Sequence, residues 1–289
     1  MARGEYVIFL DGDDSIEEES LARIAAMISA NPGADLYPCA IVAYNEDSEA
    51  REIRDNYTDA SPTEMTGKEA TLELDRLWHG GFCPMLQLTV FRREFLIEHD
   101  LKCIYGLRRQ DSEFSPRALY LAKRVVPLHE PFYLYRVRAN SVSTASKDVG
   151  RFHKDFSIIF KSLLDFYAKV SREPDFDDRM GPCWARQWLS RIFYVWFYPH
   201  NVDHITRERR LETLNAVFAD GFADFDSLLK FANPPKRIAG MWTRWFVRHP
   251  ALRWWVETFF RGYYALSESK GRRKRAFRKH IAGDERTVL

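Results

Sequence analysis

The stretch EYVIFLDGDD, residues 5–14, decides the fold class of this chain. It begins as a run of strand-forming apolar residues and ends at three aspartates, Asp11, Asp13 and Asp14, with one glycine among them. The apolar run predicts a strand over residues 6–10 that is buried on both faces, as in the interior of an α/β sheet. Because such sheets bind ligands beyond the carboxyl ends of their strands, we expect the aspartates at a functional site.

Three carboxylates this close together repel one another unless a cation joins them. A hard divalent ion, Mg²⁺ or Mn²⁺, suits carboxylate ligands and usually shares its site with substrate phosphates. The structural alternative is an acidic surface turn in which Asp14 or Ser15 caps the following helix.

Strand and helix patterns alternate over residues 15–150, which indicates an α/β unit. Thr66 and Glu69 have the spacing of a capping box at the start of one helix. Residues 45–64 are polar and predict a loop or a short exposed strand. Helices are predicted over 16–30, 66–78 and 92–99, and a further helix is opened by residues 106–114 and runs to about residue 123. Strands are predicted over 35–44, 87–91, 124–128 and 131–137.

From about residue 150 the pattern becomes helical and rich in aromatic residues, with helices predicted over 151–170, 183–198 and 207–231. We therefore expect an α/β region over 1–149, a helical region over 150–233 and an aromatic, basic helical tail over 234–289. The net charge of +2 hides a strong asymmetry: the tail holds 14 Lys and Arg residues against four acidic ones.

The four cysteines are far apart and form neither a metal knuckle nor a readable disulfide pattern, so a reducing cytoplasmic location is expected.

Three motifs then occur in order: residues 2–14 around the aspartates, residues 92–114 ending in GLRRQDSEF, and residues 124–144, RVVPLHEPFYLYRVRANSVST. Together they resemble family 2 glycosyltransferases of the GT-A fold, particularly bacterial enzymes that build surface polysaccharides. The resemblance covers about half of the chain. It implies a partial GT-A (Rossmann-like) sheet followed by an all-helical C-terminal region.

The resemblance also implies roles for particular residues. Asp11 and Asp13 would hold Mn²⁺ or Mg²⁺ against the diphosphate of a nucleotide-sugar, with Asp13 the favoured direct ligand and Asp14 a helix cap. Asp111 matches the base that takes the proton from the acceptor hydroxyl, and Gln110 replaces the glutamate that usually precedes it. The structural alternative for Asp111 is an ordinary helix N-cap.

Arg136 and Arg138 match the closing motif of the family, where arginines would face the diphosphate or an anionic acceptor because guanidinium binds phosphate oxygens well. The alternative places both on the polar side of an edge strand.

The family pattern also includes two strands that bind the nucleoside, and the ten residues before the aspartates leave no room for them. The expectation is a fragment that is inactive alone, with an apolar strand edge left exposed at residues 6–10.

The implied function is inverting transfer of a sugar from a nucleotide-sugar, UDP-linked by preference, to a cell-surface polysaccharide or a lipid-linked glycan. Two alternatives stay open. FLDGDDS also resembles the first motif of Mg²⁺-dependent haloacid-dehalogenase-type phosphatases, with Asp11 as nucleophile and Asp13 as general acid and base. The chain could also be a non-catalytic membrane or assembly module.

Aromatic residues with a cationic flank in the tail suit the headgroup region of an anionic bilayer, which would place the protein on the inner face of the cell membrane. The alternative is that these aromatic residues pack against residues 151–231. No recognised nucleic-acid motif accompanies the basic cluster, and no nucleic-acid partner is expected.

Overall fold

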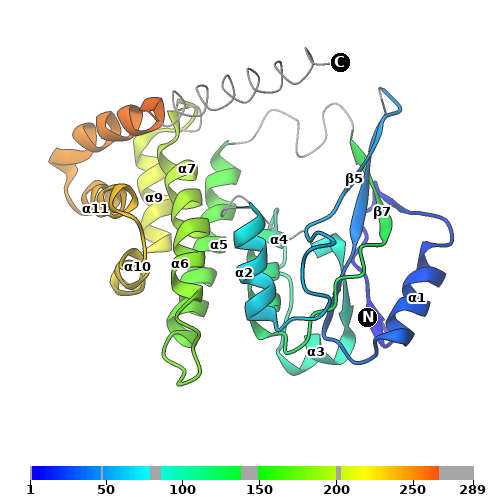
Figure 1. Ribbon diagram of the computed structural model, residues 1–289. Helices are drawn as coiled ribbons and strands as arrows, with labels where there is room; N and C mark the ends of the chain where they lie inside the picture. The colour runs from blue at the N-terminus through cyan, green and yellow to red at the C-terminus, as the bar shows by residue number, and fades with distance from the viewer. Residues whose placement is uncertain (1, 47, 79–85, 138–148, 200–202, 267–289) are drawn as a thin grey trace, which may run out of the picture.

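Strands and helices are interspersed up to residue 137, and the described residues after it form helices and the turns between them, as the sequence predicts (Figure 1). The structure is a computed structural model that describes residues 2–46, 48–78, 86–137, 149–199 and 203–266. The mixed α/β class with a helical C-terminal region is confirmed, and the boundaries of the three expected regions stay a prediction.

Within the described residues, seven short strands form two sheets. They are β1 (Tyr6–Val7), β2 (Ser15–Ile16), β3 (Leu36–Pro38), β4 (Ala40–Asn45), β5 (Arg51–Arg54), β6 (Thr89–Arg92) and β7 (Pro131–Val137). One sheet has the order β1–β6–β3 and the other β2–β7–β4–β5. Only β4 and β7 are parallel, and the other neighbouring pairs are antiparallel. The predicted strand over 35–44 is divided because the chain changes sheet after Pro38.

The prediction that residues 6–10 form an interior strand is wrong. The strand is only Tyr6–Val7, and among the described strands it pairs with β6 alone, at the edge of its sheet. Residues 6–9 are half-buried and Leu10 is 51% exposed. The expectation that missing strands leave a flat apolar edge at residues 6–10 stays a prediction.

The helix predicted to begin at residue 16 begins later, because tertiary pairing overrides its helical spacing. Ser15 and Ile16 pair with β7, and the amide of Glu17 donates to the carbonyl of Phe132 over 2.7 Å. The helix α1 (Ser20–Ala30) is preceded by Glu19 in a left-handed conformation, φ 61°. Neither Asp14 nor Ser15 caps it, so this alternative for the acidic turn is also wrong.

The remaining helices lie close to their predicted ranges. They are α2 (Gly67–Trp78), α3 (Arg93–Glu98), α4 (Asp111–Leu121), α5 (Val149–Val170), α6 (Met180–Trp184), α7 (Ser190–Phe197), α9 (Arg207–Val217), α10 (Ala223–Leu229), α11 (Pro234–Arg248) and a helix over 253–266. A 3₁₀ turn, η1 (Leu86–Leu88), precedes β6, and a π-helical segment, η2 (Ala185–Leu189), joins α6 to α7. The predicted helix over 207–231 is divided into α9 and α10, with Gly221 between them at φ +96°.

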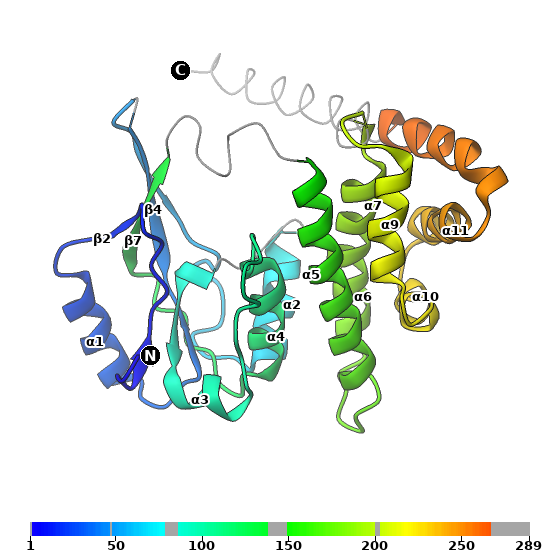
Figure 2. The same cartoon turned by 180° about the vertical axis from the view of Figure 1, so that it is seen from behind.

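Helices cover the sheets on two sides, with α1 on one side and α2 and α4 on the other (Figures 1 and 2). Ile24 and Ile28 of α1 pack in one apolar cluster with residues of β3, β4, β6 and β7, and α2 and α4 supply a second cluster. The predicted capping box is confirmed at the start of α2. The amide of Thr66 donates to Glu69 Oε2 over 2.8 Å, and the amide of Glu69 donates to Thr66 Oγ1 over 3.3 Å.

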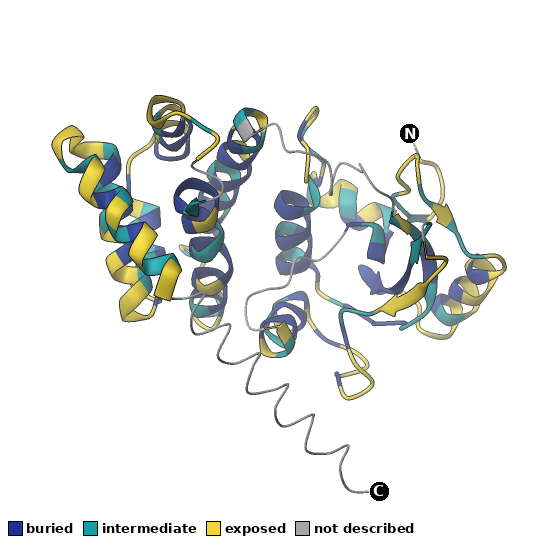
Figure 3. Ribbon diagram, turned by 90° about the horizontal axis from the view of Figure 1, so that it is seen from above, coloured by how far each residue is buried: buried dark blue, intermediate teal, exposed yellow. Residues whose placement is uncertain are grey.

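A third apolar cluster holds the helical stack together and joins it to the α/β part. Its members from the stack include Trp184, Trp196 and Phe260, all at most 1% exposed, and Leu107 and Tyr120 join them from the loop before α4 and from α4 itself. Figure 3 shows the buried residues on the inward faces of these helices. The helix that carries Asp111 is therefore fixed between the sheet and the helical stack.

Candidate functional site

Two residues of β7 hold the acidic turn that follows β1. The hydroxyl of Tyr133 accepts from the amide of Asp11 over 3.1 Å and donates to Asp14 Oδ2 over 2.7 Å. The amide of Arg136 donates to Asp14 Oδ1 over 2.9 Å. Asp14 thus works as the anchor of the turn, and Asp11 and Asp13 are exposed beside it.

Asp11 lies in an environment that disfavours its negative charge. Desolvation is the main reason that the pKa of its carboxyl is raised, and the charges of Asp14 and Asp13 add to this effect. The side-chain amide of Gln87 donates to Asp11 Oδ2 over 2.8 Å and opposes the shift. A bound cation would relieve the repulsion among these carboxylates.

Arg136 is brought to the same turn. Its side chain pairs with Glu46, which is the main reason that its pKa is raised, and the charge of Asp13 contributes in the same direction. Arg136 is therefore near Asp13, while its guanidinium is held by Glu46. Arg138 lies outside the described residues.

The two exposed carboxylates fit part of the coordination shell of a hard divalent ion. Within the described ranges no group of three or more His, Cys, Asp or Glu side chains could hold a metal ion. Asp11 and Asp13 alone would leave several positions to water and to ligand oxygens, as is usual for Mg²⁺ bound with phosphates. The residues present thus fit an ion shared with a diphosphate better than an ion held by protein alone.

Asp111 is the first residue of α4 and follows Gln110, the residue at the N-cap. Burial raises the pKa of its carboxyl, while the amide of Ser112 and the charges of Arg109 and Arg191 act in the opposite direction. Arg109 has a left-handed backbone, φ 58°, and its guanidinium lies 5.7 Å from the ring centroid of Phe152 on α5. A half-buried carboxylate beside a strained loop is typical of functional sites.

The second carboxylate of this motif, Glu113, has a different environment. It is fully buried, and it pairs with Arg117 and accepts from the hydroxyl of Ser162 on α5 over 2.6 Å. Glu113 therefore fixes α4 against α5. Asp111, two residues earlier, is less deeply buried than Glu113.

Three phenylalanine rings connect the acidic turn to α4. Phe9, two residues before Asp11, lies 5.7 Å from the ring of Phe91 on β6 and 5.9 Å from the ring of Phe114 on α4. The rings of Phe91 and Phe114 are also 5.7 Å apart. Since Phe114 is three residues after Asp111, the aspartate turn and the start of α4 belong to one packed unit.

Sequence reasoning missed the residues that position the candidate site. Tyr133 and Gln87 lie in predicted strands, but nothing in a strand pattern says which hydroxyl or amide will reach a turn far away in the sequence. Arg191 lies in a predicted helix of the stack, and its effect on Asp111 depends on how that helix packs. The roles of Asp11, Asp13, Arg136 and Asp111 themselves stay predictions.

Comparison with known proteins places the fold among glycosyltransferases. No protein-family model matches the chain. Over 143 residues it is 29% identical to EpsJ, an uncharacterized glycosyltransferase of Bacillus subtilis (strain 168), and this match covers 49% of the chain and 40% of EpsJ. In structure it is similar to residues 1–349 of TarS of S. aureus, crystallised in complex with UDP-GlcNAc, with a TM-score of 0.62 and 18% identity. That similarity covers 90% of the chain and 69% of the TarS structure.

The structural likeness shows that the chain shares the fold of the TarS structure over most of its length. The chain spans less than half the length of EpsJ. None of the helices in the described part of the chain has the length and apolar character needed to cross a membrane.

Proposed function

We propose that this chain carries the metal- and acceptor-binding residues of an inverting glycosyltransferase. It transfers a sugar from a nucleotide-sugar, UDP-linked by preference, to a cell-surface polysaccharide or a lipid-linked glycan. The observation that carries the proposal is the packed unit of Phe9, Phe91 and Phe114, which joins the turn of Asp11 and Asp13 to the start of α4 at Asp111.

The comparisons support the reaction class. One relative is named a glycosyltransferase, and the similar structure was solved with a nucleotide-sugar bound. A fold shared with TarS over most of the chain favours a sugar transferase over the phosphatase that the motif FLDGDDS also resembles.

In the proposed mechanism Asp11 and Asp13 would hold Mn²⁺ or Mg²⁺, which supplies positive charge where the diphosphate leaves. The bond between the anomeric carbon and the donor phosphate breaks, and its electron pair stays on the diphosphate. The acceptor oxygen forms the new bond from the opposite face, and its proton passes to the carboxylate of Asp111.

The environment of Asp111 suits this step. Its raised pKa makes it a stronger base than an exposed aspartate, while its carboxylate remains available once deprotonated. A base that is already in position needs little intrinsic strength, because the hydroxyl becomes acidic only as the sugar bond breaks. Arg136 and Arg138 would face the diphosphate or an anionic acceptor, with Arg136 exchanging Glu46 for the ligand.

Metal binding tests the proposal directly on this chain. Mn²⁺ is titrated into the protein in the presence of UDP and followed by calorimetry or by the loss of the free-ion paramagnetic resonance signal. Asp11→Asn and Asp13→Asn are each expected to weaken binding by about tenfold or more, because each removes a charged ligand.

The matched control is Asp59→Asn, which changes an exposed aspartate outside the site in the same way. It should leave the affinity unchanged. Equal Mn²⁺ affinities for the wild type and the two site variants would refute the assignment of the metal site.

A further inference from the structure

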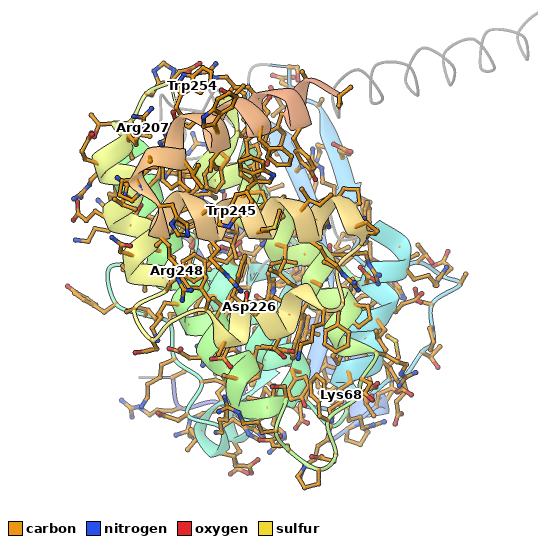
Figure 4. The ribbon with its side chains drawn as sticks, turned by 90° about the vertical axis from the view of Figure 1, so that its left-hand side faces the viewer. Lys68, Arg207, Asp226, Trp245, Arg248 and Trp254 are labelled. Atoms are coloured by element: carbon orange, nitrogen blue, oxygen red, sulfur yellow. The ribbon has the colours of Figure 1, made fainter. Side chains whose placement is uncertain are left out.

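The last two described helices present an apolar face to solvent. Figure 4 shows α11 and the helix over 253–266 lying across one side of the helical stack, with Trp245 on α11 and Trp254 on the final helix. The two helices are joined through the 3₁₀ turn η3 (Pro250–Leu252).

Part of their aromatic content packs inward, as the packing alternative predicts. Phe246, Val256 and Phe260 are at most 1% exposed in the core of the stack. Trp242 stacks on Phe259 with ring centroids 5.0 Å apart, which fixes the two helices against each other. These contacts account for the inner face, and large side chains of the outer face are exposed to solvent.

The outer face is apolar where a surface helix is normally polar. Trp254 and Trp255 are each 58% exposed, and their rings meet edge to face at 4.8 Å. Leu266 is 67% exposed further along the same helix, and Ile238 and Met241 of α11 are 45% and 42% exposed. Large exposed apolar side chains gathered on adjoining helices mark an interaction surface.

The charge around this face is mainly positive, although Asp226 pairs with Arg244 and Asp203 pairs with Arg261. Residues 234–266 contain six Lys and Arg residues and a single acidic residue, Glu257. Glu257 is turned toward the stack, where Arg207 holds Oε2 over 2.6 Å and the buried Arg210 holds Oε1. The sequence beyond, residues 267–289, adds eight Lys and Arg residues against three acidic ones.

We propose that this face, formed by Trp254, Trp255, Leu266, Ile238 and Met241, binds the surface of an anionic lipid bilayer. Tryptophan is amphipathic and favours the headgroup level, and a surround with an excess of positive charge is attracted to acidic lipids. This surface is independent of the proposed chemistry, since its residues are not part of the acidic turn or of the start of α4.

Vesicle co-sedimentation of the full chain tests the proposal. Wild type should bind vesicles of phosphatidylcholine that contain about a third phosphatidylglycerol, bind pure phosphatidylcholine far less, and lose binding as salt is added. The double variant Trp254→Ser/Trp255→Ser should bind the anionic vesicles about tenfold or more weakly, because two exposed rings no longer enter the interface. Both residues are exposed, so its thermal unfolding should match that of the wild type.

Trp78→Ser is the matched control, since Trp78 is 47% exposed on α2, away from this face. It should bind vesicles as the wild type does. Absence of wild-type binding to anionic vesicles, or equal binding by the double variant, would overturn the proposal. A dimer that is seen by light scattering and lost in the double variant, without vesicle binding, would also overturn it and assign the face to a second copy of the chain.

Discussion

Removing the hydroxyl of Tyr133 should loosen the acidic turn without changing any proposed ligand. The ring is fully buried between the sheets, so Tyr133→Phe keeps the packing and deletes only two hydrogen bonds. One of them, to Asp14 Oδ2 at 2.7 Å, is a short bond to a charged group. The amide of Arg136 and the side chain of Gln87 still contact the turn.

The size of the effect follows from the charged bond. Hydrogen bonds to ionised groups contribute about 1.5–3 kcal/mol, and the half-exposed carboxylate of Asp14 recovers part of this from water. We therefore expect the free energy that stabilises the ordered turn to fall by about 1–2 kcal/mol. If Mn²⁺ binds only the ordered turn, its affinity should fall by a factor of about 5–30.

Tyr37→Phe is a closely matched control. The Tyr37 side chain is also fully buried, and its hydroxyl accepts from the amide of Ala34 over 3.0 Å and donates to the carbonyl of Asn31 over 2.7 Å. Its partners lie at the end of α1 and the start of β3, away from the aspartates. Both variants should unfold at lower denaturant concentration, but only Tyr133→Phe should weaken Mn²⁺ binding.

The measurement is a Mn²⁺ titration of both variants with UDP present, paired with urea unfolding. Unchanged Mn²⁺ affinity in Tyr133→Phe would refute the idea that this hydroxyl positions the turn. Equal losses of affinity in the two variants would show a general effect of stability instead.

Three further changes test other parts of the structure. In a context in which the enzyme is active, Asp111→Asn should reduce sugar transfer by about 10²-fold or more. Because burial raises the pKa of the Asp111 carboxyl, its stabilising contribution is present below about pH 4 and lost as pH rises. The variant should therefore unfold at a higher urea concentration than the wild type at pH 7 but not at pH 3. Burial lowers the pKa of His153 to about 4, so the free energy of unfolding should fall between pH 6.5 and 4, and His153→Leu should flatten that fall in urea titrations. Gly67→Ala places a Cβ 1.6 Å from the carbonyl oxygen of Leu119 and should destabilise the protein by about 3 kcal/mol, whereas Gly262→Ala, with open space around it, should be neutral or stabilising.

Features that depend on neighbours in the sequence could be predicted well. The capping box of Thr66 and Glu69 needs only a spacing of three residues, and it forms as expected. The same is true of the helix that opens at Asp111, where polar residues precede a run of helix-forming ones.

Features set by distant contacts could not be predicted. Ile16 has helical spacing with the apolar residues of α1, but pairing with β7 draws it into a strand. Tyr133 and Arg136, which donate to Asp14, lie 119 and 122 residues further along the chain. Which aspartate of the turn they contact depends on the register of the strands. A single sequence shows where carboxylates gather, but not which of them anchors the turn and which faces a ligand.

The triangle of Phe9, Phe91 and Phe114 has a consequence for how such a chain can vary. The three rings pack edge to face at nearly equal separations. Replacing one ring by a smaller side chain leaves a cavity that the other two rings can fill only by shifting. Such a shift would change the distance between the turn of Asp11 and Asp13, proposed to bind the donor, and Asp111, the proposed base for the acceptor. We therefore expect the three positions to covary among related chains, with a smaller ring at one compensated by a larger side chain at another.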